Sequence, residues 1–127
     1  MEKRCIVAEN GPPALGPYSH AVAAGNLLFV SGQGPVARDG SGVRHGTIEE
    51  ETRLTLDNLK AILEDAGSSL AQVVKTTCYL ADMGNFARFN EVYKTYFSEQ
   101  FPARTTIQAA RLPGDIQVEI EAIAVLL

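Results

Sequence analysis

Polar side chains suited to binding a carboxylate and moving a proton lie near the C-terminal end of the sequence. Arg104 follows Pro102 in one strand-like run, and Glu119 and Glu121 alternate with apolar residues in the next. An arginine guanidinium is planar and binds a carboxylate through two parallel hydrogen bonds. Glutamate is a residue type used in general acid–base catalysis. These residue types indicate arginine and carboxylate chemistry on the last two strands.

We predict that residues 104–111 and 116–126 pair as an antiparallel hairpin around a turn at residues 112–115. This register places Arg104 and Glu119 roughly 13 Å apart, at about 3.3 Å per residue. The residues that share one face come from both strands: Arg104, Thr106, Gln108, Glu119, Glu121 and Ile123. Such a face is too polar for a monomer's core. It is either a solvated outer face, which the pattern alone favours, or a polar cleft.

Other residues that could do chemistry are few. The sequence has two histidines and neither a C-x-x-C nor an H-E-x-x-H motif, so we do not expect a zinc site. His20 is interpreted as a strand surface residue and His45 as a solvated loop residue. Lys75 is expected to face outward from a strand rather than to form a Schiff base. No glycine-rich nucleotide-binding motif or G-x-S-x-G elbow is present.

The elements that must position these residues begin with a hairpin. Strand-like runs at residues 19–24 and 27–31 flank Gly25-Asn26, a dipeptide typical of a hairpin turn. Residues 32–46 contain five glycines and are predicted to form a long loop. Thr47 and Glu50 then match a capping box, which starts a helix that Gly67 ends.

The second half of the chain predicts one more helix and three more strands. Residues 72–81 are rich in β-branched types and indicate a strand. Asp82 is a candidate cap for the second helix. The expected order is β-β-β-α-β-α-β-β, an α+β fold in which two helices cover one face of about six strands. The other face must be solvated or buried in an oligomer. The second helix carries an aromatic stripe that we expect in the core: Phe86, Phe89, Tyr93, Tyr96 and Phe97.

Composition limits the class of protein. The 127 residues suffice for one compact domain, which we expect to span residues 1–127. A net charge of −4 argues against a nucleic-acid backbone or an anionic membrane as the main partner. Cys5 and Cys78 are expected to be reduced thiols. No apolar stretch approaches the ~20 residues of a membrane span. We expect a soluble, cytoplasmic protein, with an organelle matrix as the alternative.

Short motifs in collinear order carry a resemblance to a known family over about residues 16–124. The sequence resembles the RidA/YjgF family of reactive-intermediate deaminases, also known as the L-PSP endoribonuclease family. The matching motifs are Gly16-Pro17-Tyr18-Ser19, Gly25-Asn26, Ser31-Gly32-Gln33, Asn58-Leu59, Val74-Lys75-Thr76-Thr77, Asn90-Glu91-Val92-Tyr93, Pro102-Ala103-Arg104 and Val118-Glu119-Ile120-Glu121-Ala122.

The resemblance implies a fold, an assembly and an activity. It implies a chorismate-mutase-like α+β fold that forms a homotrimer, with its sheets inward and its active clefts between subunits. Family members hydrolyse 2-imino acids such as 2-iminobutanoate and 2-iminopropanoate to 2-keto acids and ammonia. These imines arise from enamines released by pyridoxal-phosphate enzymes, and the hydrolase itself needs no cofactor. The resemblance favours a polar cleft over a solvated face at the last strands.

The resemblance also implies roles for single residues. Arg104 would bind the substrate carboxylate, and Glu119 would handle the attacking water. Thr106 stands where many members have cysteine, and Gly34 replaces a bulkier aliphatic residue, which would widen that edge of the cleft. Further residues are expected to line the cleft: Tyr18, Ser31, Gly32, Asn90, Thr106 and Pro113.

Two other functions remain as alternatives. A 2-keto-acid-binding or regulatory trimer would use the same Arg104 pocket without turnover, but pure carboxylate binding does not need Glu119. A ribonuclease or translation inhibitor is the weaker alternative, because the chain is acidic and lacks an aromatic stacking stripe for bases and a histidine pair.

Overall fold

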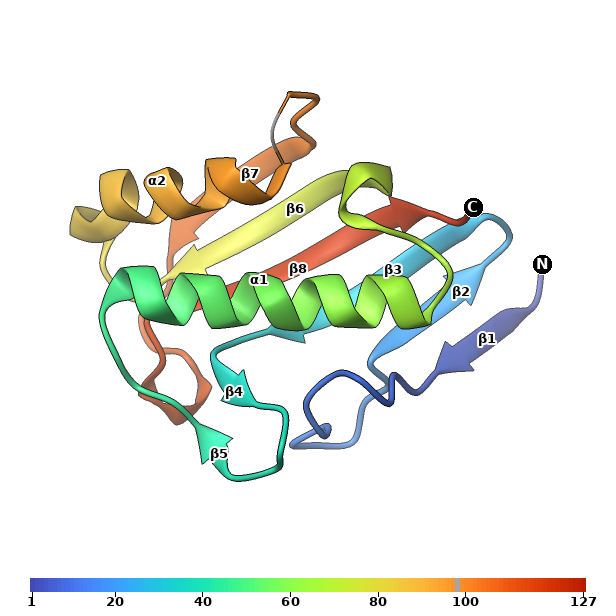
Figure 1. The fold of residues 1–127 in the computed structure, drawn as a ribbon, viewed down its shortest axis with the longest axis horizontal. Helices are drawn as coiled ribbons and strands as arrows, with labels where there is room; N and C mark the ends of the chain where they lie inside the picture. Colours follow the sequence, from blue (N-terminus) through green and yellow to red (C-terminus); the bar gives the residue numbers. More distant parts are fainter. Residues whose placement is uncertain (98) are drawn as a thin grey trace.

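The computed structural model describes residues 1–97 and 99–127. Three short 3-10 turns, η1 (Leu70–Gln72), η2 (Met83–Asn85) and η3 (Pro113–Asp115), join the longer elements. Those longer elements follow one another as β1 (Lys3–Ile6), β2 (Ala21–Ala24), β3 (Leu27–Gln33), β4 (Val36–Ala37), β5 (Gly42–Val43), α1 (Ile48–Asp65), β6 (Val73–Leu80), α2 (Phe86–Phe97), β7 (Ala103–Gln108) and β8 (Val118–Val125) (Figure 1). The predicted order of the main elements and the α+β class are confirmed. The stretch predicted as a long loop instead contains a small ribbon, in which β4 pairs with β5.

Six strands form one sheet in the order β1-β2-β3-β8-β6-β7. All neighbours are antiparallel except β6 and β7, which are parallel. The predicted hairpin between the last two strands is therefore wrong. Strand β8 lies between β3 and β6, so both of its edges are occupied. Strand β7 reaches the outer edge of β6 after the crossover through α2, as a parallel connection requires.

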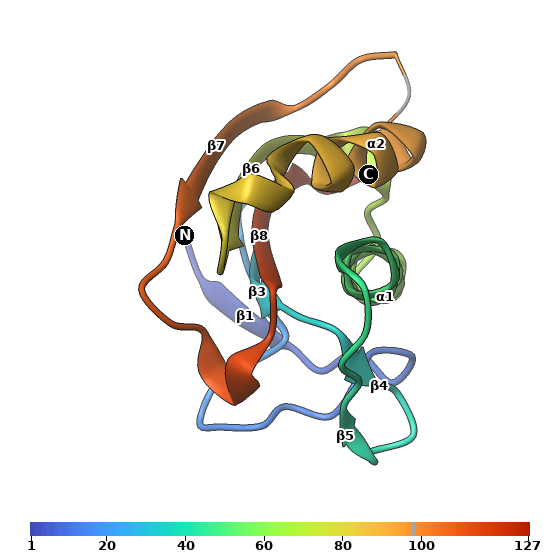
Figure 2. The same cartoon turned by 90° about the vertical axis from the view of Figure 1, so that its left-hand side faces the viewer.

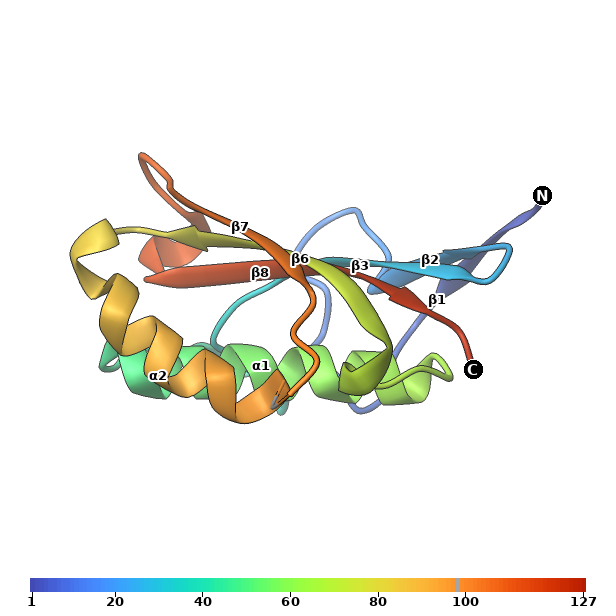
Figure 3. The ribbon, with the colours of Figure 1, turned by 90° about the horizontal axis from the view of Figure 1, so that it is seen from above.

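Both helices pack on the same face of the sheet, as expected for two helices on six strands (Figures 2 and 3). The core between the layers contains Leu56, Leu59 and Ile62 of α1 and Val118 and Ile120 of β8, all fully buried. The opposite face of the sheet has no covering element among the described residues, and large apolar side chains such as Phe29 are 44% exposed there. Within the described ranges, no helix is both long and apolar enough to cross a membrane.

The ends of α1 confirm the capping prediction. The Thr47 hydroxyl accepts a hydrogen bond from the Glu50 amide, and the Glu50 carboxylate accepts one from the Thr47 amide. At the other end, the Ser68 amide donates to the Leu63 carbonyl and Gly67 adopts a φ of 86°. This left-handed conformation favours glycine and ends the helix.

His20 is not the surface residue predicted. Its side chain is buried: Nδ1 accepts a hydrogen bond from the Ala8 amide at 2.9 Å, and Nε2 lies 2.7 Å from the Pro12 carbonyl. A carbonyl only accepts, so Nε2 carries the proton and the ring is held as one neutral tautomer. His20 thus ties the segment between β1 and β2 to the core, a role that only long-range packing reveals.

The aromatic stripe on α2 is only partly core. Phe89, Tyr93 and Phe97 are buried as predicted. Phe86 is 37% exposed at the start of the helix, beside the edge strand β7. The exposed part of the stripe belongs to the site described below.

Candidate active site

A cleft of about 490 Å³ opens where β3 and β8 meet the loop before β2. The β3–β8 ladder is interrupted between Val30 and Gln33, and the interruption places Ser31 and Gly32 at the mouth of the cleft. Strand bulges are common beside functional sites because they redirect side chains and free backbone groups. Five of the predicted site residues line this first cleft: Tyr18, Ser31, Gly32, Pro113 and Glu119.

Glu119 is the acidic group of the first cleft. It lies half-buried against Gly32, and a Cβ on residue 32 would collide with its carboxylate, so only glycine leaves room for this packing. Within the described chain, no group donates a hydrogen bond to the Glu119 carboxylate. Burial, and secondarily the negative charge of Glu121, raise the pKa of Glu119. A carboxyl group with a raised pKa and no partner is suited to exchanging protons with water.

Glu121 differs from Glu119 although it lies on the same face of β8. Its carboxylate accepts a hydrogen bond from the Tyr79 hydroxyl at 2.8 Å, and it is exposed. Glu121 is outside the cleft, so the structure separates the two acidic candidates of the sequence pattern.

Two hydroxyl groups line the same cleft as Glu119. The Ser31 hydroxyl donates to the Ser19 carbonyl at 2.7 Å, which leaves its oxygen able to accept a hydrogen bond. The Tyr18 hydroxyl accepts a hydrogen bond from the Leu15 amide at 3.2 Å, so its own proton is available for a bound molecule. In residues 1–97 and 99–127, neither hydroxyl forms a hydrogen bond with a basic side chain, which argues against nucleophilic attack by Ser31 or Tyr18.

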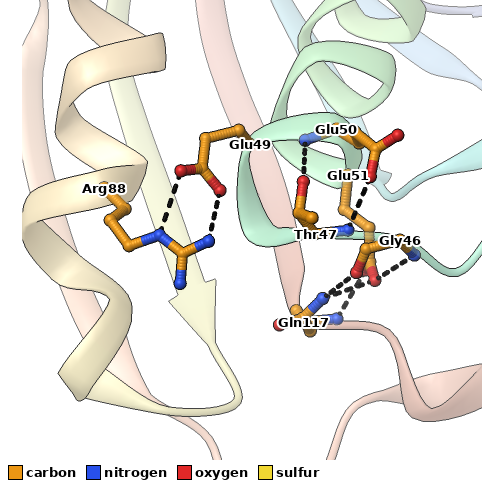
Figure 4. Close-up of polar contacts among 7 residues, drawn as sticks. All are labelled: Gly46, Thr47, Glu49, Glu50, Glu51, Arg88 and Gln117. Carbon is orange, nitrogen blue, oxygen red and sulfur yellow. Dashed lines mark hydrogen bonds and ion pairs between the residues drawn. The ribbon is translucent and has the colours of Figure 1, made fainter.

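The start of β8 is held from the N-terminal turn of α1 (Figure 4). Glu51 is only 2% exposed, and its carboxylate accepts hydrogen bonds from the Gln117 amide at 2.8 Å and the Gln117 side chain at 2.7 Å. It also accepts one from the Gly46 amide at 3.2 Å. Gln117 lies in the sequence between the turn η3 and Glu119, which both line the first cleft. The buried Glu51 carboxylate therefore holds this part of the cleft wall in place by binding Gln117.

Arg104 lies in a second cleft, of about 340 Å³, between the edge strand β7 and α2. Its Nη1 donates to the Asn90 side-chain oxygen at 2.8 Å, and its guanidinium carbon lies 4.8 Å from the centre of the Tyr93 ring. Phe86 and Phe89 are also within 6 Å of this guanidinium. No carboxylate of the described residues pairs with Arg104. Four N–H donors therefore remain for an anionic ligand.

Within one chain, Arg104 and Glu119 cannot bind the same small molecule. Arg104 is in register with Thr76, whose side chain is buried toward the helices. Glu119 is in register with Tyr79, whose side chain points to the other face. Strand spacings put the two Cα atoms about 14 Å apart. The prediction that both residues share one face is wrong, because the pairing through β6 aligns Arg104 with Ala122. Ala122 is three residues from Glu119, and successive side chains of a strand point to opposite faces.

Thr106 lines neither cleft. It is in register with Cys78 on the helix side of the sheet, and its hydroxyl oxygen is buried without a hydrogen-bond partner in the described structure. Burial raises the pKa of the Cys78 thiol to about 11, so this thiol is not a nucleophile at neutral pH. Asn90 joins Arg104 in the second cleft. The predicted site residues thus form two separate groups.

The aromatic rings under Arg104 are functional-site residues that the sequence pattern alone does not predict. Phe86, Asn90 and Tyr93 recur at helical spacing on α2, and Phe101 adds a ring at the mouth of the second cleft. Asn90 within the aromatic stripe is the one sequence signal of this site, because a stripe that only fills the core does not need an amide side chain. The apolar wall of the first cleft, described below, was also missed. No group of three potential metal-ligating His, Cys, Asp or Glu side chains occurs in the described part of the chain.

Comparisons with known proteins define the class. The family model described as Endoribonuclease L-PSP matches residues 8–126. The chain belongs to this family, which is the RidA/YjgF family that the sequence motifs indicated. It is 51% identical to a RutC family protein of Pyrococcus horikoshii over 96% of this chain and 97% of the relative.

Relatives with more informative names are also similar over nearly their full lengths. The chain is 43% identical to the 2-iminobutanoate/2-iminopropanoate deaminase of Escherichia coli, over 96% of this chain and 97% of that protein. Among solved structures, a putative endoribonuclease of Thermotoga maritima has a TM-score of 0.94 and 48% identity, covering 100% of this chain and 99% of the other. Escherichia coli TdcF with bound serine has a TM-score of 0.91 and 40% identity, covering 98% and 99%.

Proposed function

We propose that this protein is a 2-imino-acid deaminase that works as a homotrimer. Its substrates would be 2-iminobutanoate and 2-iminopropanoate, formed from enamines that pyridoxal-phosphate enzymes release, and its products 2-keto acids and ammonia. The observation that carries the proposal is that Arg104 and Glu119 are both free to bind a ligand yet lie on opposite faces of one sheet. A second copy of the chain would bring the Arg104 cleft of one subunit to the Glu119 cleft of the next.

The chemistry of the two clefts supports this reaction. The free donors of Arg104 would bind the substrate carboxylate, and Asn90 and the aromatic rings would hold the guanidinium in place. Glu119 of the neighbouring copy would accept a proton as water adds to the C=N carbon. The resulting carbinolamine would then take that proton on nitrogen. As the C–N bond breaks, its hydroxyl would give a proton back to Glu119, which releases ammonia and leaves the ketone. Water is the only co-reactant, and the reaction uses no cofactor.

A 2-keto-acid-binding trimer without turnover is the main alternative. It would require the Arg104 cleft but gives no reason for a half-buried, unpaired carboxylate, which costs folding free energy at neutral pH. The ribonuclease alternative lacks a general base among the histidines. Both nitrogens of His20 are used in hydrogen bonds to the backbone, and His45 is an exposed loop residue outside both clefts.

A subunit-complementation assay tests the proposal. The variants Arg104→Ala and Glu119→Gln should each lose hydrolysis of imines that an amino-acid oxidase generates in the assay. When the two variants are co-expressed, each shared site takes one residue from each copy, so about a quarter of the sites regain both groups. Activity recovery to about that level supports the proposal. Wild-type protein that leaves the imines untouched would overturn the function, and mixed trimers without recovery would overturn the shared site.

A further inference from the structure

The first cleft continues past Glu119 into an apolar half that the proposed reaction does not yet use. Its polar side chains lie outside that half: Ser31 and Glu119 are at the bulge in β3, and Tyr18 lies beside Leu15, whose amide donates to the Tyr18 hydroxyl. The apolar half is lined by Gly34, Val36, Val43, Pro113, Gly114 and Ile116.

The walls of this apolar half are held in place from two sides. The buried side chain of Asn58 donates hydrogen bonds to the Gly34 carbonyl at 3.1 Å and the Val36 carbonyl at 2.8 Å. On the other side, a Cβ on Gly114 would lie 3.0 Å from the Val43 side chain, so the turn η3 touches the β4–β5 ribbon. The apolar half is therefore a preformed surface rather than a gap between mobile loops.

Gly34 sets how much room this half has. A Cβ at residue 34 would lie only 2.7 Å from Cδ1 of Ile116, so the isoleucine occupies the space that a larger residue at position 34 would take. Gly34 is not among the residues with positive φ, so its backbone conformation does not demand glycine. A side chain at position 34 would displace the end of Ile116 into the cleft and narrow it. The wider cleft expected at this edge therefore results from the Ile116 side chain, which packs against the Gly34 backbone instead of extending into the cleft.

We infer that the apolar half of the first cleft binds the substrate side chain, so that the protein hydrolyses imino acids with aliphatic side chains of three or more carbons more efficiently than the shorter 2-iminopropanoate and 2-iminobutanoate. The inference rests on the proposed function and names the substrate class of that same site. If the carboxylate lies on Arg104 and the C=N carbon beside Glu119, the side chain is the remaining substituent on that carbon. Each CH2 group that it buries here raises kcat/KM about threefold to tenfold. A polar side chain would find no hydrogen-bond partner on this surface.

The test is a comparison of substrates on the wild-type protein. An amino-acid oxidase generates the imines of alanine, 2-aminobutyrate, norvaline and leucine, and kcat/KM is measured for each. We expect values that rise along the series, with the leucine imine at least tenfold above the alanine imine. Calorimetry with pyruvate and 4-methyl-2-oxopentanoate should show the same order of affinity. Equal kcat/KM for the alanine and leucine imines would overturn the inference while leaving the proposed function intact. No hydrolysis of any imine would overturn the proposed function itself.

Variants in the wall of the apolar half distinguish selection of the substrate side chain from a general loss of activity. Gly34→Ala should lower kcat/KM for the leucine imine at least tenfold more than for the alanine imine. The double variant with Ile116→Ala should restore the preference, because it removes the displaced methyl groups. Gly84→Ala, outside both clefts, is the matched glycine-to-alanine control and should leave the ratio at the wild-type value. A ratio unchanged in folded Gly34→Ala protein would overturn the inference, and if that variant does not fold, the wild-type substrate series decides.

Discussion

At the scale of single residues, the two candidate catalytic groups differ in how the surrounding residues stabilise their charged forms. Arg104 is supported by an amide oxygen and three aromatic rings, which leave its remaining donors free. Glu119 is desolvated without a compensating donor in the described residues, and its pKa is raised. A protein keeps an uncompensated carboxylate of this kind at a cost to stability, which is typical of functional sites.

The first prediction separates catalysis from binding at Glu119. Glu119→Gln keeps the size of the side chain but removes the proton acceptor, so imine hydrolysis should fall by about 100- to 10,000-fold. The Kd for a 2-keto acid, measured by calorimetry, should change far less because Arg104 provides that binding. Glu121→Gln is the control on the same strand face, and its rate should stay close to wild type. A larger loss at Glu121 would show that the wrong carboxylate had been chosen.

The same variant predicts a pH-dependent gain in stability. The folded pKa of Glu119 lies above its unfolded value, so its contribution favours folding at low pH and is lost as pH rises through the folded pKa. Glu119→Gln should therefore be more stable than wild type at pH 7.5, and the difference should vanish at pH 4. Urea unfolding midpoints at the two pH values measure this. A stability difference that does not depend on pH would contradict a raised pKa.

A third prediction concerns the geometry of the arginine. Arg104→Lys keeps the charge but loses the planar pair of donors, so kcat/KM should fall about 10- to 100-fold while the fold is retained. Steady-state kinetics with circular dichroism as the folding check provides the measurement. Lys94→Gln removes a second cation that lines the same cleft but is already paired with Glu91 at 2.9 Å, and it should cost less. Equal losses would mean that charge alone matters in this cleft.

At the scale of elements, α1 positions the catalytic strand as well as filling the core. Three consecutive glutamates at its N-terminus have three different roles (Figure 4). Glu50 closes the capping box, and Glu49 forms a two-bond ion pair with Arg88 of α2. Glu51 accepts the backbone amide of Gln117, the residue just before β8. Glu51 has no cation among its partners, and three N–H donors stabilise its buried oxygens instead.

Removing Glu51 should loosen this connection. Glu51→Ala leaves two Gln117 donors and the Gly46 amide without their acceptor, so we expect a loss of about 3 kcal/mol in the free energy of unfolding. Urea unfolding followed by circular dichroism measures the loss. Glu49→Ala, in the same turn but at an exposed ion pair, should cost far less. If both substitutions cost the same, Glu51 would have no special role in holding β8.

At the scale of the whole molecule, the face of the sheet that no helix covers exposes large apolar side chains. Leu27, Phe29 and Ile107 are between 37% and 46% exposed there in one chain. Large apolar side chains exposed on a sheet face that no helix covers favour an interface on that face. The same face of β8 carries Glu119, so an assembly through this face would also bring a second chain toward the first cleft.

The assembly prediction is a stable trimer in solution. Light scattering should give three times the 13.7 kDa mass of one chain. Phe29→Glu should break the assembly, because it buries a charge in the interface, and should abolish hydrolysis with it. Lys60→Glu, an exposed charge change on the helix side, is the control and should leave the trimer intact. A monomer with full activity would show that one chain contains the complete site.

Local signals were sufficient to predict much of the molecule. The capping box at Thr47, the turn at Gly25-Asn26 and the strand at residues 73–80 depend on interactions between near neighbours in sequence, so the sequence alone determines them. These local elements are confirmed because side-chain type and spacing set local backbone structure directly. The family motifs indicated Arg104 and Glu119 as site residues, and each lines a cleft, while their roles stay predictions.

Only the tertiary structure decided which strands pair and therefore which residues meet. An alternation of polar and apolar residues is compatible with a hairpin of β7 and β8 and equally with two separated strands. Contacts between segments distant in sequence determine which strands pair. Strands β7 and β8 both pair with β6, in a register that aligns Arg104 with Ala122 and therefore places Arg104 and Glu119 on opposite faces. The burial of His20 depends in the same way on two backbone groups eight and twelve residues away. The sequence by itself determined the chemical groups and the local elements, and the long-range packing determined that one chain holds them in two separate clefts.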